Sequence, residues 1–236
     1  MGNAQNTMTL ASCMKSFSDT IAWLRRGRRI STNGRPVKLN LGSSLVVHEG
    51  WINIDATHHI LFRKLPKPVL TILYRHSQIP QFLSEEQYLS RLTECEFVHH
   101  SLIYGIPLAD GTAEFVYTSH FLEHLYEEQA NALLRESFRV LKPGGRIRVC
   151  IPDLKHAVEC YLEGRKRDAL GYFFQPANVH TYERHRFMYD FELLAAMLKN
   201  SGFRDMEECK YQEGQVPDLA KLDNRSDETL YVEAAK

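Results

Sequence analysis

Lys38-Leu39-Asn40-Leu41-Gly42-Ser43-Ser44 and, after a short gap, Gly50-Trp51-Ile52-Asn53-Ile54-Asp55 are the two runs from which the fold is predicted. Each contains a short apolar strand; the first strand leads into a Gly/Ser turn and the second ends on a carboxylate. Gly42 lets the backbone approach a ligand closely, and the turn can offer N–H groups to it. Asp55 stands where a carboxylate can accept both hydroxyls of a ribose. The pattern predicts the nucleotide pocket of a doubly wound α/β sheet.

Strands and helices alternate along the rest of the chain. We expect further strands at 96–100, 114–118, 146–151, 203–211 and 229–234, and helices at 127–141, 154–162 and 189–200. Alternation of this kind predicts a mostly parallel sheet with helices on both faces. We expect a tail and a short amphipathic helix with a basic end over residues 1–30, and a single domain over 31–236 with an insertion at about 56–94.

Composition restricts the class of protein. The chain has 236 residues, with 29 Lys and Arg against 29 Asp and Glu, so it lacks the basic excess that is expected of a nucleic-acid-binding protein. No apolar run reaches the roughly 18 residues of a membrane span, and the start of the chain lacks a secretory signal pattern. The five cysteines are scattered without a C-x-x-C pair, which favours reduced thiols and a cytoplasmic location.

Four blocks of sequence, in this order, resemble a known family, the small "type 11" class I S-adenosylmethionine-dependent methyltransferases. The first two are the runs quoted above. The third runs from Ile106 to Leu125 and contains Ser119-His120-Phe121-Leu122-Glu123-His124, and the fourth runs from Leu134 to Gly145 and ends in Lys142-Pro143-Gly144-Gly145. Each block alone is weak evidence, but four at fold-compatible spacing are specific.

The resemblance implies a Rossmann-like, seven-stranded sheet, mostly parallel with an antiparallel last strand, and S-adenosylmethionine as the cofactor. Carried over by position, Gly42, Ser43 and Ser44 would line the methionine moiety and Asp55 would hold the ribose. Ser101, Leu102 and Ile103 would face the adenine. Ser119 and His120 would lie near the sulfonium and the methyl acceptor.

Three departures from the family pattern bear on the cofactor. Ser43 and Ser44 stand where further glycines are usual, and Ser101 stands where an acidic residue often binds the adenine amino group. The gap between Leu41 and Trp51 is too short for a crossover helix, which normally needs a dozen or more residues, so we expect a turn there or a differently shaped loop. These departures keep open the alternative of a non-catalytic or regulatory binding protein on a methyltransferase fold.

Candidate catalytic residues follow the fourth predicted strand. His120 and His124 are four residues apart and would share a face if a helix began at Ser119, and histidine readily accepts a proton near neutral pH. Glu123 could orient either ring. We expect His120 to lie closest to the reacting centre, which favours O-methylation. In the alternative interpretation, His124 and Glu123 only pack against or cap the start of a helix.

The acceptor side of the pocket is predicted from Asn178, His180, Tyr182 and His185, a polar cluster that could bind a small molecule or a glycan or could be a charged surface loop. His120 and His124, with His180 or His185, could also form a three-ligand metal site. Since H-E-x-x-H is absent, we expect no metal. The basic end of the first helix leaves contact with a membrane surface open, and the sequence predicts no particular oligomeric state.

Overall fold

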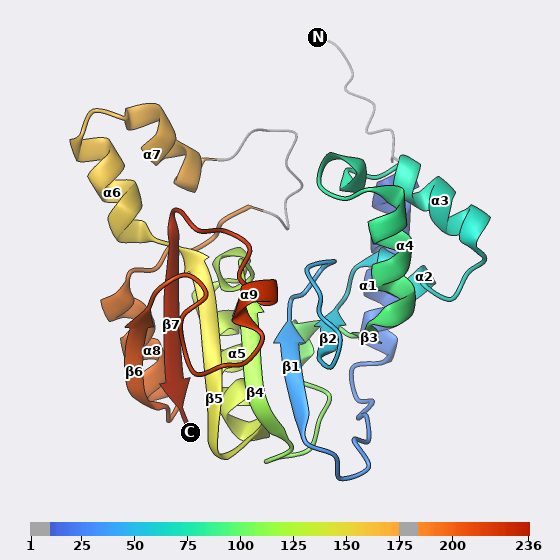
Figure 1. Ribbon diagram of the computed structural model, residues 1–236, viewed down its shortest axis with the longest axis horizontal. Coiled ribbons are helices and arrows are strands. Elements are labelled where there is room, and N and C mark those ends of the chain that lie inside the picture. The colour runs from blue at the N-terminus through green and yellow to red at the C-terminus, as the bar shows by residue number, and fades with distance from the viewer. Residues whose placement is uncertain (1–9, 175–183) are drawn as a thin grey trace.

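The computed structural model describes residues 10–174 and 184–236 of the chain. Its centre is a seven-stranded sheet in the order β3-β2-β1-β4-β5-β7-β6. The strands are β1 (Val37–Leu41), β2 (Ile52–Asp55), β3 (Glu96–His99), β4 (Ala113–Ser119), β5 (Leu141–Pro152), β6 (Arg204–Cys209) and β7 (Thr229–Ala235). Strands β1 to β5 pair in parallel, and β7 runs antiparallel between β5 and β6. The predicted sheet, with its reversed last strand, is confirmed (Figure 1).

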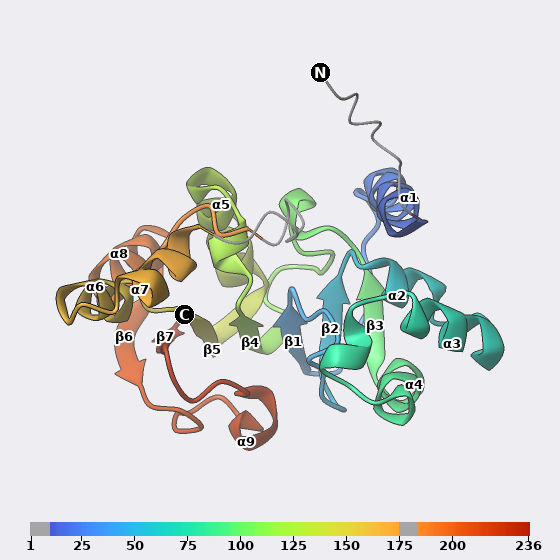
Figure 2. The same cartoon turned by 90° about the horizontal axis from the view of Figure 1, so that it is seen from above.

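Helices cover both faces of this sheet, as the alternation predicted (Figure 2). The α-helices of the described residues are α1 (Leu10–Leu24), α2 (His58–Phe62), α3 (Lys67–Arg75), α4 (Glu85–Glu94), α5 (Glu127–Val140), α6 (Leu154–Leu162), α7 (Lys166–Phe173), α8 (Phe191–Asn200) and α9 (Leu219–Leu222), and short 3-10 turns lie at Ile79–Gln81, Leu102–Tyr104 and Leu122–His124. Helices α5 and α8 pack on one face, and α4 and α9 lie on the other.

Alternating residues of the central strands supply the core on the two faces. Val116 of β4 packs in the large cluster beneath α5 and α8, whereas Tyr117 packs on the opposite face beside Trp51 and α9. This is the inward and outward alternation of a strand that is buried on both sides. The third cluster joins the insertion to the sheet through Tyr88 and Leu92 of α4 and Phe97 of β3.

Element ends agree with the sequence where local signals are strong. Asp190 caps α8, because its carboxylate Oδ1 accepts from the backbone N–H of Leu193 at 2.9 Å. The connection from β1 to β2 contains only turns, as the short gap predicted, and the two strands still pair in parallel.

One prediction about element ends was wrong. Helix α1 spans Leu10–Leu24 rather than the predicted Phe17–Arg29, so the whole basic run at residues 25–29 lies beyond the helix. The helix predicted over 127–141 is confirmed, since α5 spans Glu127–Val140. A 3-10 turn at Leu122–His124 precedes it, so the helix from Ser119 that would put His120 and His124 on one face does not form.

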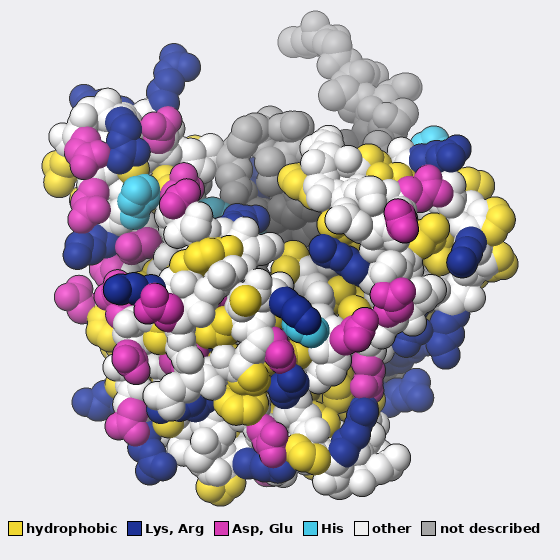
Figure 3. Space-filling model, viewed as in Figure 1, with side chains coloured by type: hydrophobic (Ala, Val, Ile, Leu, Met, Phe, Trp, Pro, Cys, Tyr) yellow, Lys and Arg dark blue, Asp and Glu magenta, His cyan; other side chains and the backbone are white. Residues whose placement is uncertain are grey.

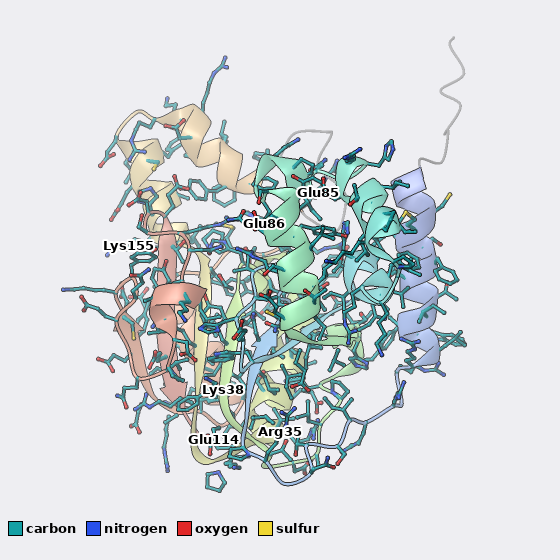
Figure 4. All side chains as sticks on the ribbon, turned by 45° about the vertical axis from the view of Figure 1, so that its right-hand side comes forward. Arg35, Lys38, Glu85, Glu86, Glu114 and Lys155 are labelled. Atoms are coloured by element: carbon teal, nitrogen blue, oxygen red, sulfur yellow. The ribbon has the colours of Figure 1, made fainter. Side chains whose placement is uncertain are left out.

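The amino ends of the parallel strands carry exposed ion pairs, and the predicted functional residues lie at the carboxyl ends. Arg35 and Glu114 lie near the amino ends of the strands in Figure 4, away from Glu85, Glu86 and Lys155. Arg35 pairs with Glu96 at 2.6 Å and Lys142 pairs with Glu114 at 3.5 Å. These exposed pairs contribute little to stability. The residues that the sequence singles out for function lie at the other end of the sheet.

Candidate active site

Strand register brings the predicted cofactor residues to one edge of the sheet. Leu41 pairs with Ile54 on one side and with Thr118 on the other. The residues that follow these three, Gly42, Asp55 and Ser119, therefore lie side by side where the parallel strands end. In an open α/β sheet, this carboxyl-end edge at the change of strand direction is where ligands bind.

The loop after β1 has the backbone conformation of a ligand-binding turn. Gly42 has φ of +65° and Ser44 has φ of +44°. Residues other than glycine rarely adopt this left-handed backbone conformation. The backbone N–H of Ser44 donates to Oδ2 of Asp55 at 3.0 Å, which holds the turn against the end of β2. Serine can thus replace glycine here because a carboxylate partner stabilises the turn.

Asp55 is held by two backbone donors. Besides Ser44, the N–H of Thr57 donates to Oδ1 at 2.7 Å. A carboxylate has about four acceptor positions, so each oxygen keeps one for a ribose hydroxyl. Burial raises the pKa of the Asp55 carboxyl, and the N–H groups of Ser44 and Thr57 oppose that shift. The residues present therefore fit the sugar of the cofactor.

Phe121 lies directly over Gly42. A Cβ atom at position 42 would lie 2.2 Å from the Phe121 ring, so only glycine fits beneath it. Sequence analysis did not single out Phe121, although it follows His120 in the third family block. His120 itself has φ of +48°, and strained backbone of this kind is found at functional sites.

The segment predicted to face the adenine follows the end of β3. The N–H of His100 donates to the carbonyl of Asp55 at 3.1 Å, which sets Ser101 beside β2. The side chain of Leu102 is buried in the hydrophobic core, and that of Ile103 is exposed. Only the backbone of Leu102 can face a ligand. Helix α1 reaches the same place, since Ser18 Oγ donates to the carbonyl of Ala56 at 2.7 Å.

The predicted catalytic residues meet, but not on a helix face. Glu123 is only 1% exposed, and its Oε1 lies 3.4 Å from His120 Nδ1 and 3.8 Å from His124 Nε2. Burial alone would raise the pKa of Glu123, but the neighbouring imidazoles of His120 and His124 lower it below its ordinary value. The extended and 3-10 backbone between β4 and α5, rather than helical spacing, brings the three side chains together.

His185 joins this cluster from a distant segment of the chain. Its ring centroid lies 5.4 Å from that of His124. The other predicted acceptor residues, Asn178, His180 and Tyr182, lie outside the described residues. Glu123, His124 and His185 each place a ligand atom within 4.8 Å of the others, so they are the described group that could hold a metal ion.

A cavity of about 380 Å³ lies elsewhere, between the end of α1, α2 and β3. Its walls include Arg25, Arg28, Arg63 and Lys64 and no carboxylate. None of the predicted cofactor residues lines it. Its basic lining differs from that of the predicted cofactor site.

Solved structures with similar architecture include methyltransferases. A methyltransferase from Archaeoglobus fulgidus is 19% identical, with 96% of this chain and 94% of that chain covered and a TM-score of 0.46. One from Thermotoga maritima is 14% identical, with 95% and 91% covered and a TM-score of 0.45. Human N-acetylserotonin methyltransferase, in complex with S-adenosylmethionine, is 15% identical, with 94% and 55% covered and a TM-score of 0.49.

Comparison with curated proteins gave no match. Comparison with protein families matched residues 63–149 to the methyltransferase domain, a segment that runs from the insertion into β5. The resemblance found in the sequence is thereby confirmed. The family match and the fold support a class I S-adenosylmethionine-dependent methyltransferase, whose cofactor is S-adenosylmethionine.

Proposed function

We propose that the protein transfers a methyl group from S-adenosylmethionine to a hydroxyl of a small molecule or glycan. One observation supports this proposal: the Gly42–Asp55 pocket and the His120–Glu123 pair lie at the same edge of the sheet. The pocket has the features of a cofactor site, and the pair offers a proton acceptor beside a buried carboxylate.

When bound, the cofactor supplies a methyl group on a sulfonium, ready for in-line displacement. The chain has to hold the acceptor oxygen in line, which can provide much of the acceleration, and to receive its proton. We assign the proton to His120, because Glu123 Oε1, 3.4 Å from its Nδ1, can stabilise the imidazolium that forms. Arg225 Nη1 lies 3.4 Å from the same ring nitrogen. Thr229 Oγ1, 3.2 Å from His120 Nε2, holds the ring from the other side.

Titration calorimetry with S-adenosylmethionine tests the cofactor half of this proposal. We expect saturable binding that Asp55→Ala weakens by about tenfold or more, because the variant loses charge-assisted hydrogen bonds to the ribose. Asp205→Ala is the matched control, since Asp205 is an exposed carboxylate on β6. Absence of binding at millimolar cofactor, or equal binding by the Asp55→Ala variant, would contradict the proposal.

Mass spectrometry of the reaction products can identify the methyl acceptor. Incubation with labelled cofactor and a metabolite extract should give a product heavier by one CH₂ group, together with S-adenosylhomocysteine. Figure 3 shows acidic and basic side chains interspersed on the face in view, and the net charge is zero. Both observations support a small acceptor over nucleic acid, which salt-sensitive retention of RNA or DNA would reverse.

A non-catalytic binding protein is the second candidate, and the Phe121 ring over Gly42 favours it. Such a protein would bind the cofactor weakly, or would bind it without yielding S-adenosylhomocysteine from any acceptor pool. The product search described above separates the two.

A further inference from the structure

Glu123 is a buried carboxylate without the partners that burial normally requires. Neither of its oxygens has a hydrogen-bond partner among residues 10–174 and 184–236, although the side chain is almost wholly inaccessible. The nearest imidazole nitrogens lie at 3.4 and 3.8 Å, beyond good hydrogen-bond range. An unpaired buried charge is costly, so something else must satisfy this carboxylate in the working protein.

The two imidazoles of the group are oriented as metal ligands are. His185 Nδ1 lies 2.7 Å from the carbonyl of Tyr172, and His124 Nδ1 lies 3.3 Å from the carbonyl of Arg184. A ring that donates Nδ1–H to a carbonyl keeps Nε2 as a free lone pair, and metal-bound histidines are usually fixed in this way.

A second polar group nearby is also unsatisfied. The hydroxyl of Tyr189 is buried without a partner among the described residues. Its segment approaches that of Glu123, because the backbone N–H of Phe187 donates to the carbonyl of Glu123 at 3.4 Å. Buried polar groups normally have partners, and a bound ion or water can supply them.

We propose that Glu123, His124 and His185 bind a divalent transition-metal ion of the zinc class. Two imidazoles and a carboxylate are the ligand set of open zinc sites, which keep a further position for water or substrate. The ligand atoms already lie within 4.8 Å of one another, and an ion held by all three would lie about 2 Å from each of them. The sequence predicted no metal because the H-E-x-x-H motif is absent. In the proposed site, Glu123 and His124 are adjacent in the chain and His185 comes from a distant segment.

The role of the ion rests on the proposed function. The open position would bind the hydroxyl oxygen of the acceptor and lower its pKa. The hydroxyl proton passes to His120, a new bond forms between the oxygen and the methyl carbon, and the bond from that carbon to sulfur breaks. Sulfur keeps the electron pair and becomes a neutral thioether. The acceptor class is therefore an alcohol or phenol whose hydroxyl oxygen can bind the ion.

Cobalt(II) is the probe, because its visible spectrum reports the coordination sphere. The chelator-treated full-length protein should bind one equivalent with an absorption band of low coordination number. Glu123→Gln and His185→Ala should each weaken binding by about a hundredfold, as expected for loss of a direct ligand. His156→Ala is the matched control, since His156 Nε2 lies 3.4 Å from Cys160 Sγ and forms the competing place for adventitious cobalt.

Each outcome decides the inference. Absence of stoichiometric cobalt binding, or binding that only His156→Ala removes, overturns it. Two ligand variants, on different segments, guard against misfolding, and circular dichroism of each confirms its fold. Cofactor binding measured on the same samples separates the proposals: cobalt without cofactor binding keeps the metal site and contradicts the methyltransferase activity, and cofactor without cobalt binding does the reverse.

Discussion

At the scale of single residues, substitutions at Gly42 and Gly111 can separate two costs of adding a Cβ atom. One is the cost of an unfavourable backbone conformation, and the other is the cost of a steric clash. Gly42→Ala adds a Cβ both at φ of +65° and against the Phe121 ring. Gly111 has φ of +61° with open space around its Cβ position, so Gly111→Ala measures the conformational cost alone, about 1 kcal/mol. We expect Gly42→Ala to cost a further ~1–3 kcal/mol of unfolding free energy, measured by urea denaturation.

The double variant Gly42→Ala/Phe121→Ala should recover most of that further cost, because the ring that the new Cβ meets is gone. Equal destabilisation by Gly42→Ala and Gly111→Ala would show that Phe121 yields freely. The ring would then be a movable cover over the cofactor loop rather than a fixed part of it.

Part of the candidate site could be predicted from the sequence, and the rest depends on tertiary contacts. Gly42 and Asp55 were predictable because a strand, a tight turn and a carboxylate carry a local signal. The 3-10 turn between His120 and His124 was not, since a short polar segment can begin a helix or precede one with similar local energy. The proximity of His185 to His124 depends on chain folding over a span that no local pattern records.

At the scale of elements, the insertion over 56–94 is joined internally by a buried polar contact. His59 of α2 lies with its Nδ1 3.0 Å from the hydroxyl of Tyr88 of α4, and both side chains are buried. Burial, with a smaller contribution from neighbouring His58, lowers the pKa of His59 to about 3. Apolar side chains of this insertion therefore pack from its helices onto the edge of the sheet.

This contact predicts a pH dependence of stability. The folded state disfavours protonated His59, whose ordinary pKa is 6.5. Stability is thus greatest above pH 6.5 and is lost as the pH falls toward 3, because the unfolded chain takes up the proton first. We expect the unfolding free energy to fall by roughly 1–2 kcal/mol from pH 7 to pH 5 through this group.

His59→Gln should flatten that dependence in denaturant unfolding at the two pH values. Part of the slope will remain, because burial also lowers the pKa of His99, to about 4. An unchanged slope in the variant would show that the α2–α4 contact does not exclude the proton.

At the scale of the whole molecule, a buried ion network fixes the last third of the chain to the sheet. Arg148 of β5 is fully buried, and its guanidinium donates to Asp223 at 2.6 Å and to Glu233 of β7 at 3.1 Å. It also donates to the carbonyls of Lys210 and Glu213. One side chain thus ties together the central sheet, the β6–α9 loop and the antiparallel strand.

Arg148→Met should destabilise the protein by about 3–5 kcal/mol, because it leaves two buried carboxylates without a counter-charge. The triple variant Arg148→Met/Asp223→Asn/Glu233→Gln should regain much of that loss in the same denaturation assay. If the single variant were as stable as the wild type, water would have to reach this network, contrary to its full burial.

The sequence by itself determined the sheet, the reversed last strand, the turn after β1 and the positions of Gly42 and Asp55, because periodicity and turn chemistry act over a few neighbouring residues. It also indicated the family. Only the tertiary structure decided that Phe121 covers Gly42, that Arg148 holds Asp223 and Glu233, and that His185 meets Glu123 and His124. These contacts join segments far apart in the chain, and the free energy that selects them comes from burial and charge pairing, which no single stretch of sequence contains.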